Sequence, residues 1–362
     1  MTQSQLKERL LGMLEAYVYR GPGGKLVGMG ALLLSGGLPF VGNLELNRTL
    51  PNGDFVRGTL ATAGTAWWAT AVCLALGAIL VLAGLFLIFR QYQDQSRKRV
   101  IAIELRGLAQ TLDSSIQSAI PRRVMGRRDL VLIDVREQVQ GTPRQRQEAI
   151  AEVNLIPRHL KTNKSGNNRD DLTLYVGGLA PVPLLFLAGN LLAAESKINW
   201  MDWDRKALKW VSPAAGVDLQ SPSIIHCEGH LGTETLVAIS ISYPVDINEL
   251  RIAFPALPLV EIKIEGATPG HVVSESSTRQ IQQAFMDTMA MLQGQGVRKV
   301  HLVLAAPSVL SMQLGGVYAG RNMPALVIYQ YQKAQVENPY PWGVEMPNSE
   351  RHEGVYVIWE SD

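Results

Sequence analysis

The 362-residue chain contains only two cysteines, Cys73 and Cys227. Cys73 lies inside a long apolar run and Cys227 lies in the more polar part of the chain, so the pair does not make a disulfide framework. Free thiols of this kind are typical of a reducing compartment such as the cytoplasm. The sequence therefore does not belong to the class of small, disulfide-stabilised secreted proteins.

Motifs of the common enzyme classes are also missing. The chain has no Walker phosphate loop, no GxGxxG after a strand, no HExxH and no GxSxG. The segment 226–230 (HCEGH) offers metal-ligating residue types, but a structural zinc site needs a fourth ligand that the sequence does not supply. Asp246 with Glu249 fits a helix capping box better than a catalytic carboxylate pair. We therefore expect no catalytic residue, no metal and no cofactor.

The net charge is small, at +2, and it is unevenly distributed. Residues 1–99 hold ten of the 34 basic residues but only five of the 32 acidic ones, so this part carries +5 and the remainder carries −3. Binding to DNA or RNA polymers requires a basic face that neutralises phosphates. A remainder close to neutrality argues against a nucleic-acid polymer as partner and leaves room for a small anionic ligand.

One apolar run is long enough to cross a membrane. Residues 66–89 contain 24 residues without a charge or a proline, whereas a span needs about 20 residues. Arg90 and then Arg97, Lys98 and Arg99 follow the run, and such basic residues hold the flanking chain on the cytoplasmic side. We expect a transmembrane helix here.

A weaker apolar run covers residues 26–44 and contains Pro39 and five glycines. We expect it to span as well, because four basic residues precede it and only Arg48 and Arg57 lie in the 45–65 loop. The alternative is a re-entrant or interfacial segment. Gly24 and Gly28 form a GxxxG pattern, which occurs often by chance in glycine-rich segments. The prediction is a multi-pass membrane domain at 1–99 with the soluble part cytoplasmic.

The segment after the second run has helical periodicity. Ile101, Leu105, Leu108 and Leu112 are spaced by four, three and four residues, as in a coiled coil, and no proline occurs before Pro121. We expect a helical stalk or linker at 100–124 that continues the second span. The alternative is that this stripe packs on the soluble body.

The soluble body alternates strand-like and helix-like segments, which predicts an α/β fold with a parallel sheet. The predicted strands cover 130–135, 172–176, 197–203, 235–243, 259–264, 299–305, 325–331 and 354–359. The predicted helices fall near 182–194, 246–254, 275–293 and 308–319.

An internal echo indicates two similar halves. The stretch 174–181 (LYVGGLAP) leads into a helix with Gly189 eight residues after the proline, and 302–307 (LVLAAP) leads into another with Gly315 at the same offset. Small residues allow a tight turn off a strand, proline suits the first helical turn, and a buried glycine lets a helix lie close to the sheet. We predict two fused Rossmann-like halves, at 125–222 and 223–362.

Ligands of open α/β sheets bind beyond the carboxyl ends of the strands, where helix N-termini present their N–H groups. Here those positions are 177–181, 242–246 and 305–308, and Ser308 has the alternative role of capping its own helix. The predicted ligand-binding residues in or near these turns are Gly177, Gly178, Ala180, Pro181, Ser242, Ala306, Pro307, Ser308 and Ser311. Trp203, Tyr243 and Tyr318 are candidates for stacking on bases.

Two stretches carry a resemblance to a known family. Residues 301–332 (HLVLAAPSVLSMQLGGVYAGRNMPALVIYQYQ) closely resemble the signature C-terminal part of SAVED domains, and 175–192 (YVGGLAPVPLLFLAGNLL) resembles the corresponding part of their first half. The resemblance covers about residues 125–335. SAVED domains are similar to two fused CARF-type Rossmann-like units, so the resemblance implies that fold.

The resemblance also implies a function. SAVED domains bind a cyclic oligonucleotide made by a cGAS-like nucleotidyltransferase in bacterial CBASS anti-phage systems, and related proteins mostly recognise cyclic trinucleotides and oligomerise. A SAVED domain after two spans is similar to the transmembrane-SAVED effectors, which act on the bacterial inner membrane. The implied partners are a cyclic trinucleotide, the lipid bilayer and further copies of the chain. Basic residues at Lys161, Lys164, Arg169 or Arg321 are candidates for contacts with the ligand's phosphates.

Two other functions remain open on the sequence. A membrane-anchored receptor would bind the nucleotide and recruit a partner without damage to the membrane. A membrane-bound hydrolase would cleave the nucleotide, although the sequence shows no pairing of a base with a nucleophile.

Overall fold

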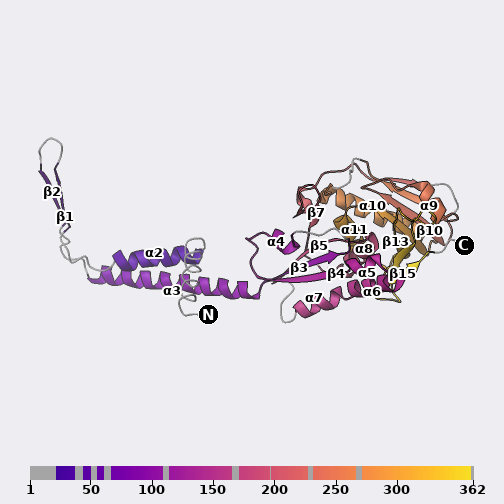
Figure 1. Ribbon diagram of the computed structural model, residues 1–362. Helices are drawn as coiled ribbons and strands as arrows, with labels where there is room; N and C mark the ends of the chain where they lie inside the picture. The colour runs from indigo at the N-terminus through magenta and orange to yellow at the C-terminus, as the bar shows by residue number, and fades with distance from the viewer. Residues whose placement is uncertain are drawn as a thin grey trace. The chain divides into compact units, whose positions relative to one another are not determined.

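The structure is a computed structural model that describes residues 22–36, 44–49, 55–60, 67–108, 114–164, 171–195, 197–226, 231–265 and 271–359 (Figure 1). The chain divides into two compact units, Met1–Arg97 and Lys98–Asp362. The first unit contains the apolar helices and the second contains the α/β body.

Two helices and a hairpin form the described part of the first unit. Helix α2 covers Pro22–Gly36 and helix α3 covers Trp67–Arg97. Strands β1 (Leu44–Thr49) and β2 (Phe55–Leu60) pair antiparallel between them. Within α3, Ala71–Arg90 is long and apolar enough to cross a membrane, with a mean hydropathy of 2.9 over 20 residues. Helix α2 has 15 residues, fewer than a full span, and residues 37–43 of the predicted first span lie outside the described residues.

Helices α2 and α3 lie side by side and pack through glycines (Figure 1). A Cβ built on Gly23 would lie 2.9 Å from the carbonyl oxygen of Gly84, and one built on Gly30 would lie 2.7 Å from that of Gly77. From the first pairing to the second, the residue number rises along α2 and falls along α3, so the two helices are antiparallel. The Gly24 and Gly28 pattern is not the contact motif, because a Cβ on Gly28 would have nothing within 4 Å.

The predicted helical stalk at 100–124 is wrong. Helix α3 ends at Arg97, and after Lys98 the chain enters strand β3, Arg99–Arg106. The stripe that contains Ile101 and Leu105 is part of six consecutive buried residues, as expected for a central strand covered on both faces. The spacing of a coiled coil arises because five of the six buried positions of this strand are apolar. The first half therefore begins at β3 rather than at residue 125.

The first half contains a four-stranded parallel sheet in the order β4-β3-β5-β6. Strands β4 (Arg127–Asp134), β5 (Leu172–Leu179) and β6 (Ile198–Trp200) accompany β3. Helices α6 (Pro143–Asn154), α7 (Ile156–Lys164) and α8 (Val182–Leu191) complete it, together with the short helices α4 (Ile116–Ala119) and α5 (Arg136–Gln140). Helix α6 begins at a capping box formed by Thr142 and Gln145.

The second half contains a seven-stranded sheet in the order β15-β14-β13-β12-β10-β11-β9. Strands β10 (Glu234–Ser240), β11 (Leu259–Lys263), β12 (Lys299–Ala305) and β13 (Ala325–Gln330) run parallel. Strands β9 (Ser223–His226), β14 (Trp342–Glu345) and β15 (Val355–Ile358) add antiparallel edges. The helices of this half are α9 (Ile247–Ala253), α10 (Glu275–Gly294) and α11 (Ser308–Val317).

The α/β prediction is confirmed, with one strand drawn too long. The predicted strand at 197–203 divides into β6 and β7 (Asp202–Asp204), and β7 pairs with β8 (Lys209–Val211) outside the main sheet. One hydrophobic cluster includes buried side chains from both halves, among them Ile103, Phe186, Phe285 and Leu302. The two halves therefore share a core and form a single body.

Helices α8 and α11 cross at the two echoed glycines. A Cβ on Gly189 would overlap the carbonyl oxygen of Met312, and one on Gly315 would overlap that of Phe186. The prediction that these glycines bring their helices close to a sheet is wrong, because each glycine instead packs against the other helix. Each of these helices begins three residues after its preceding strand ends, so its N-terminal end lies at the carboxyl end of that strand.

Candidate functional site

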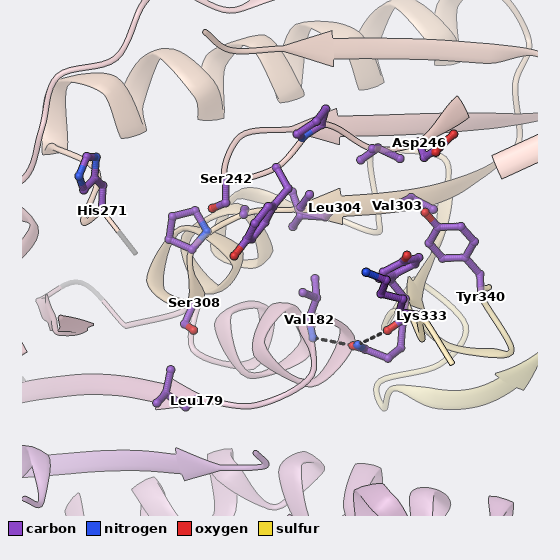
Figure 2. Close-up of a pocket in the computed structure, with 18 of the residues that line it drawn as sticks. Leu179, Val182, Ser242, Asp246, His271, Val303, Leu304, Ser308, Lys333 and Tyr340 are labelled. Carbon is purple, nitrogen blue, oxygen red and sulfur yellow. Dashed lines mark hydrogen bonds between the residues drawn. The ribbon is translucent and has the colours of Figure 1, made fainter. Parts of the chain in front are cut away.

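A cavity of about 660 Å³ lies at the carboxyl ends of strands from both halves (Figure 2). Leu179 and Val182 contribute from the end of β5 and the start of α8, and Ser242 and Ser308 contribute from the turns after β10 and β12. The other lining residues are Asp202, Trp203, Arg205, Tyr243, Pro244, Val245, Asp246, Glu249, His271, Val303, Leu304, Ala305, Ala306, Pro307, Gln330, Tyr331, Lys333 and Tyr340. This is the place in an open α/β sheet where a ligand is expected.

Half of the predicted site residues line this cavity. The six residues are Trp203, Ser242, Tyr243, Ala306, Pro307 and Ser308. They come from turns that the sequence singles out because small or hydroxyl residues follow directly after a buried strand. Their convergence depends on how the two halves pack against one another, which the order of residues along the chain does not show.

The other predicted residues lie elsewhere, and two of them are glycines within β5. A Cβ on Gly177 would overlap the carbonyl oxygen of Met201, and one on Gly178 would lie 2.8 Å from the Cβ of Leu105. These glycines therefore serve packing within the sheet. Ala180 is buried, and a Cβ on Gly107 would lie 2.7 Å from its methyl group.

Ser311, Arg321 and Pro181 are also outside the cavity. Ser311 is fully buried and its hydroxyl donates to the carbonyl oxygen of Pro307 at 3.0 Å, one turn back in α11. Arg321 follows the C-terminal end of α11, whereas the cavity lies at the N-terminal end of that helix. Pro181 lines a neighbouring cavity of about 340 Å³ that shares Gln330 with the main one and also contains Arg146 and Trp342.

Each half places a polar side chain near the start of a helix that belongs to the other half. The amide N–H of Val182, at the start of α8, donates to Oε1 of Gln330 at 3.1 Å, and Gln330 ends β13 of the second half (Figure 2). Reciprocally, the N–H of Val309 in α11 interacts with the carboxylate of Asp202, which follows β6 of the first half. Both helix N-termini that the sequence proposes as anion cradles thus already hold a polar side chain from across the cavity.

Asp202 is the most perturbed acid in the cavity. It is 6% exposed, and burial raises the pKa of its carboxyl to about 6. The N–H groups of Trp203, at 2.9 Å, and of Val309 oppose that increase, as does the nearby charge of Arg205. Asp202 therefore titrates close to physiological pH. Asp202 could have been identified from the sequence, because it is the first charged residue after β6. It was missed because the predicted strand at 197–203 extended past it, whereas β6 ends at Trp200.

The charge of the cavity is mixed. Arg205 and Lys333 bring positive charge, and His271 adds an imidazole side chain. Asp246 caps α9 by accepting the N–H of Asn248 at 2.8 Å. The predicted capping box with Glu249 is not what these residues form, because Glu249 instead accepts the hydroxyl of Tyr331 at 3.1 Å. The cavity can therefore bind a ligand that carries both anionic groups and hydrogen-bond donors.

The basic residues that the sequence proposes for phosphate contacts do not include these cations. Lys161 lies on α7 and is not part of the cavity, and Arg321 is excluded as above. The side chain of Lys164 and all of Arg169 lie outside the described residues. Arg205 had no distinguishing sequence context, because it belongs to the β7–β8 turn that the sequence did not predict.

Aromatic side chains are available on two sides of the cavity. Tyr243 is 56% exposed and Tyr331 is 40% exposed. Trp203 is 5% exposed and packs edge-on against Trp210, with ring centroids 5.4 Å apart. Tyr318 is a core residue whose hydroxyl donates to the carbonyl oxygen of Pro324 at 3.0 Å, so its predicted stacking role is wrong. Tyr243 and Tyr331 are the rings that a base can reach.

The described residues contain no group of three or more His, Cys, Asp and Glu side chains placed to hold a metal ion. Residues 227–230 of the HCEGH segment lie outside the described residues.

Solved structures of two receptors align with the chain at low similarity. The Acinetobacter baumannii Cap4 SAVED/CARF-domain containing receptor with the cyclic trinucleotide 2′3′3′-cAAA has 15% identity and a TM-score of 0.45, over 77% of this chain and 58% of the receptor. The same receptor with 3′3′3′-cAAA has 14% identity and a TM-score of 0.46 over the same shares. The Moraxella osloensis Cap4 SAVED/CARF-domain containing receptor has 15% identity and a TM-score of 0.40, over 75% of this chain and 59% of the receptor.

The chain thus spans less than two thirds of those receptors, and no curated protein matches it. Two family models match the sequence directly. The SAVED-fused 2TM effector domain matches residues 16–150. The SAVED domain, the SMODS-associated and fused to various effectors sensor domain, matches residues 156–346, which is more than half of the chain. The chain therefore belongs to the SAVED family, with its sensor domain fused to a two-transmembrane effector domain.

Proposed function

We propose that the chain is a membrane effector of bacterial anti-phage defence that responds to a cyclic oligonucleotide. In this proposal a cGAS-like nucleotidyltransferase of a CBASS system makes the nucleotide, and the SAVED body binds it on the cytoplasmic side of the inner membrane. Binding makes copies of the chain associate, and their membrane helices then disrupt the bilayer, which causes abortive infection. The observation that carries the proposal is the cavity between the two halves of a sensor domain that is fused to a membrane effector domain.

The size of the cavity supports a small-molecule ligand. Its volume of about 660 Å³ lies within the range of about 300–1,000 Å³ that is usual for such sites. We assign the cavity to a cyclic trinucleotide, with contacts from Trp203, Ser242, Tyr243, Ala306, Pro307 and Ser308 and further contacts from Arg205, Tyr331 and Lys333.

The chemistry of the lining supports a nucleotide over a simple anion. Arg205 and Lys333 can donate to phosphate oxygens. Tyr243 and Tyr331 present faces on which bases can stack. Asp246 and Glu249 can accept hydrogen bonds from the exocyclic amino groups of adenine or guanine. Inorganic phosphate would gain only the first of these contacts and would be repelled by the carboxylates.

Assembly follows if the bound nucleotide also contacts a second copy. Head-to-tail contacts of that kind produce rings or filaments. Moving the assembly equilibrium from 1:99 to 99:1 requires about 5.5 kcal/mol of differential binding, which a few charge-assisted hydrogen bonds and stacked bases can supply. The nucleotide is bound and not consumed.

The test is a leakage assay with the full chain in liposomes that contain a self-quenched dye. The probes are 2′3′3′-cAAA and 3′3′3′-cAAA within a panel of cyclic di- and trinucleotides, and inorganic phosphate is the control. We expect leakage with at least one cyclic trinucleotide and none with phosphate, and light scattering should rise with the same nucleotide. Mass spectrometry of the supernatant should recover the nucleotide intact.

Three outcomes contradict the proposal in different ways. Leakage in the absence of nucleotide contradicts gating by the cavity. Binding without assembly or leakage favours the membrane-anchored receptor that recruits a partner. Loss of the nucleotide together with a linear product favours the hydrolase.

A further inference from the structure

Lys25 is a charged residue on a helix that packs against the membrane span. It lies on α2 with an exposed side chain, and it shares the exposed face of that helix with Gly28, Met29 and Leu32. The opposite face of α2 packs on α3 through Gly23 and Gly30. Lys25 therefore points away from the helix with which α2 is paired.

The glycine contacts fix the depth of Lys25. Gly23 lies opposite Gly84 and Gly30 lies opposite Gly77, so the antiparallel register places Lys25 level with Leu82. Leu82 is eight residues from Arg90 at the end of the span Ala71–Arg90, which is about 12 Å along the helix axis. It is about 7 Å from the middle of the apolar run 66–89. Lys25 thus lies deep inside a hydrocarbon layer that is about 30 Å thick, and not ahead of it as the order of basic residues along the chain predicts.

Among the residues that the structure describes, no counter-charge accompanies Lys25 at this depth. Helix α2 and the span Ala71–Arg90 contain no Asp or Glu, and no ion pair of Lys25 occurs among the described residues. A lysine side chain extends about 6 Å, so it does not reach the polar boundary about 12 Å away. Lysines in such positions almost always face a bundle interior or a water-filled space rather than lipid.

We propose that Lys25 lines a hydrated, anion-preferring passage formed when several copies of the helix pair assemble. The proposal rests on the proposed function, because assembly of copies supplies the shared interior. In that assembly the α2 faces that carry Lys25 turn toward one another, and water and small anions such as chloride solvate the ammonium groups. Rings of Lys or Arg give pores a preference for anions.

The first test measures ion selectivity of the full chain in planar bilayers under a potassium chloride gradient, with assembly triggered by the cyclic trinucleotide that causes leakage. The unmodified chain should show a reversal potential on the chloride side. Lys25→Met should reduce that preference at least fivefold, Lys25→Glu should reverse it, and Lys25→Arg should retain it. Lys98→Glu makes the same charge change outside the span and should leave the preference intact. Unchanged selectivity in Lys25→Glu overturns this inference and leaves the proposed function standing.

The second test does not depend on a nucleotide. A spin label is placed at Lys25→Cys or Leu82→Cys in the full chain with Cys73→Ser and Cys227→Ser, in phosphatidylethanolamine–phosphatidylglycerol vesicles. The two labels should report the same depth, deep inside the hydrocarbon layer, from their relative accessibility to oxygen and to a water-soluble nickel complex. A label at residue 25 that lies at headgroup depth overturns the inference. If no nucleotide causes leakage but the label is deep, the proposed function fails and the membrane position of Lys25 stands.

Discussion

Gly189 of α8 and Gly315 of α11 occupy reciprocal positions at one helix crossing. Gly189 faces the carbonyl of Met312, three residues before Gly315, and Gly315 faces the carbonyl of Phe186, three residues before Gly189. The contact therefore repeats itself when the two helices are exchanged, as a local two-fold axis requires. The glycine that is repeated in the two halves of the sequence is therefore a residue through which the halves contact each other.

The crossing predicts a large loss of stability for Gly189→Ala. The added methyl group would overlap backbone atoms of Met312, which cannot move aside as a flexible side chain can. Overpacking of this kind costs about 1–3 kcal/mol. We expect a fall of several degrees in the thermal unfolding midpoint of the full chain in detergent.

Gly316→Ala is the matched control for that variant. Gly316 is the next residue in α11, but a Cβ there would lie 3.6 Å from the carbonyl oxygen of Gly189, an ordinary contact distance. Alanine favours helix over glycine by about 1 kcal/mol, so stability should remain the same or rise. Equal losses in Gly189→Ala and Gly316→Ala would show that the crossing is not close.

Asp202 predicts a distinctive pH dependence of stability. Burial raises the pKa of its carboxyl from 3.8 to about 6, so between those values the folded state holds a proton that the unfolded state releases. The stability contributed by this group is therefore complete below about pH 4 and decreases as the pH rises to about 6. The shift corresponds to about 3 kcal/mol.

In Asp202→Asn that decrease should be absent. Urea unfolding of the full chain in detergent should show the variant gaining stability relative to the unmodified chain between pH 4 and pH 7. Asp204→Asn is the control, because N–H groups of Ala207 and Lys206 hold the pKa of the Asp204 carboxyl below its usual value. Its effect on stability should be constant over the same range. A constant difference for Asp202→Asn as well would mean that Asp202 does not titrate there.

Elements with a strong local signal were predicted from the sequence. Helix α10 is an example. Its start is capped by Ser274, which accepts the N–H of Ser277, and its end is followed by Gly296, whose φ is +88°. Strand β3 was missed because a strand buried on both faces has no alternation, and its apolar residues also fit a helical period. Pairing with the neighbouring strands β4 and β5 decides between strand and helix, and the local sequence pattern carries no information about that pairing.

The candidate site was predictable only in part, for a related reason. Turns at the strand ends predicted Ser242, Tyr243 and Ser308, because residues adjacent in sequence define a turn. Arg205 and Gln330 reach the cavity from segments whose positions depend on how the two halves pack. No pattern within either segment records that packing.

Tyr243 predicts an effect on nucleotide binding without an effect on folding. Its ring is 56% exposed at the cavity, so removing it leaves no void in the core. Loss of one stacked base costs about 1–3 kcal/mol, and Tyr243→Ala should therefore weaken binding of a cyclic trinucleotide by about 5-fold to 150-fold. Isothermal titration calorimetry measures this. Tyr243→Phe keeps the ring and should bind normally; a loss in that variant too would assign the effect to the hydroxyl.

Comparing variants of Arg205 and its neighbour Lys206 distinguishes a specific contact with a phosphate from a general electrostatic effect. Both are exposed and carry the same charge, but only Arg205 lines the cavity. A charge-assisted hydrogen bond to phosphate is worth about 1.5–3 kcal/mol, so Arg205→Ala should weaken nucleotide binding roughly tenfold or more. Lys206→Ala should have little effect at 0.15 M salt, where charges beyond about 8 Å are screened. Equal effects would indicate a diffuse field instead of a contact.

The glycine contacts between α2 and α3 predict variants that separate sensing from the membrane output. Gly77→Leu places a large side chain against Leu34 and the backbone of Gly30, and Gly84→Leu does the same against Val27 and Gly23. Small residues are what allow two helices to approach closely in lipid, so either change should force the pair apart. Nucleotide binding should be unchanged, since the cavity lies entirely in the second unit.

Leakage from liposomes is the measurement for these variants, with calorimetric binding of the same nucleotide as the internal reference. We expect Gly77→Leu and Gly84→Leu to bind nucleotide but to release at least tenfold less dye. Ala78→Leu is the matched control, because Ala78 is exposed on the same helix as Gly77 and Gly84, so the helix pair should remain closed. Because this control adds apolar bulk at an exposed position of α3, a difference between it and the two variants assigns the effect to the packed face. Normal leakage in Gly77→Leu and Gly84→Leu would mean that the helix pair need not stay closed for the bilayer to fail.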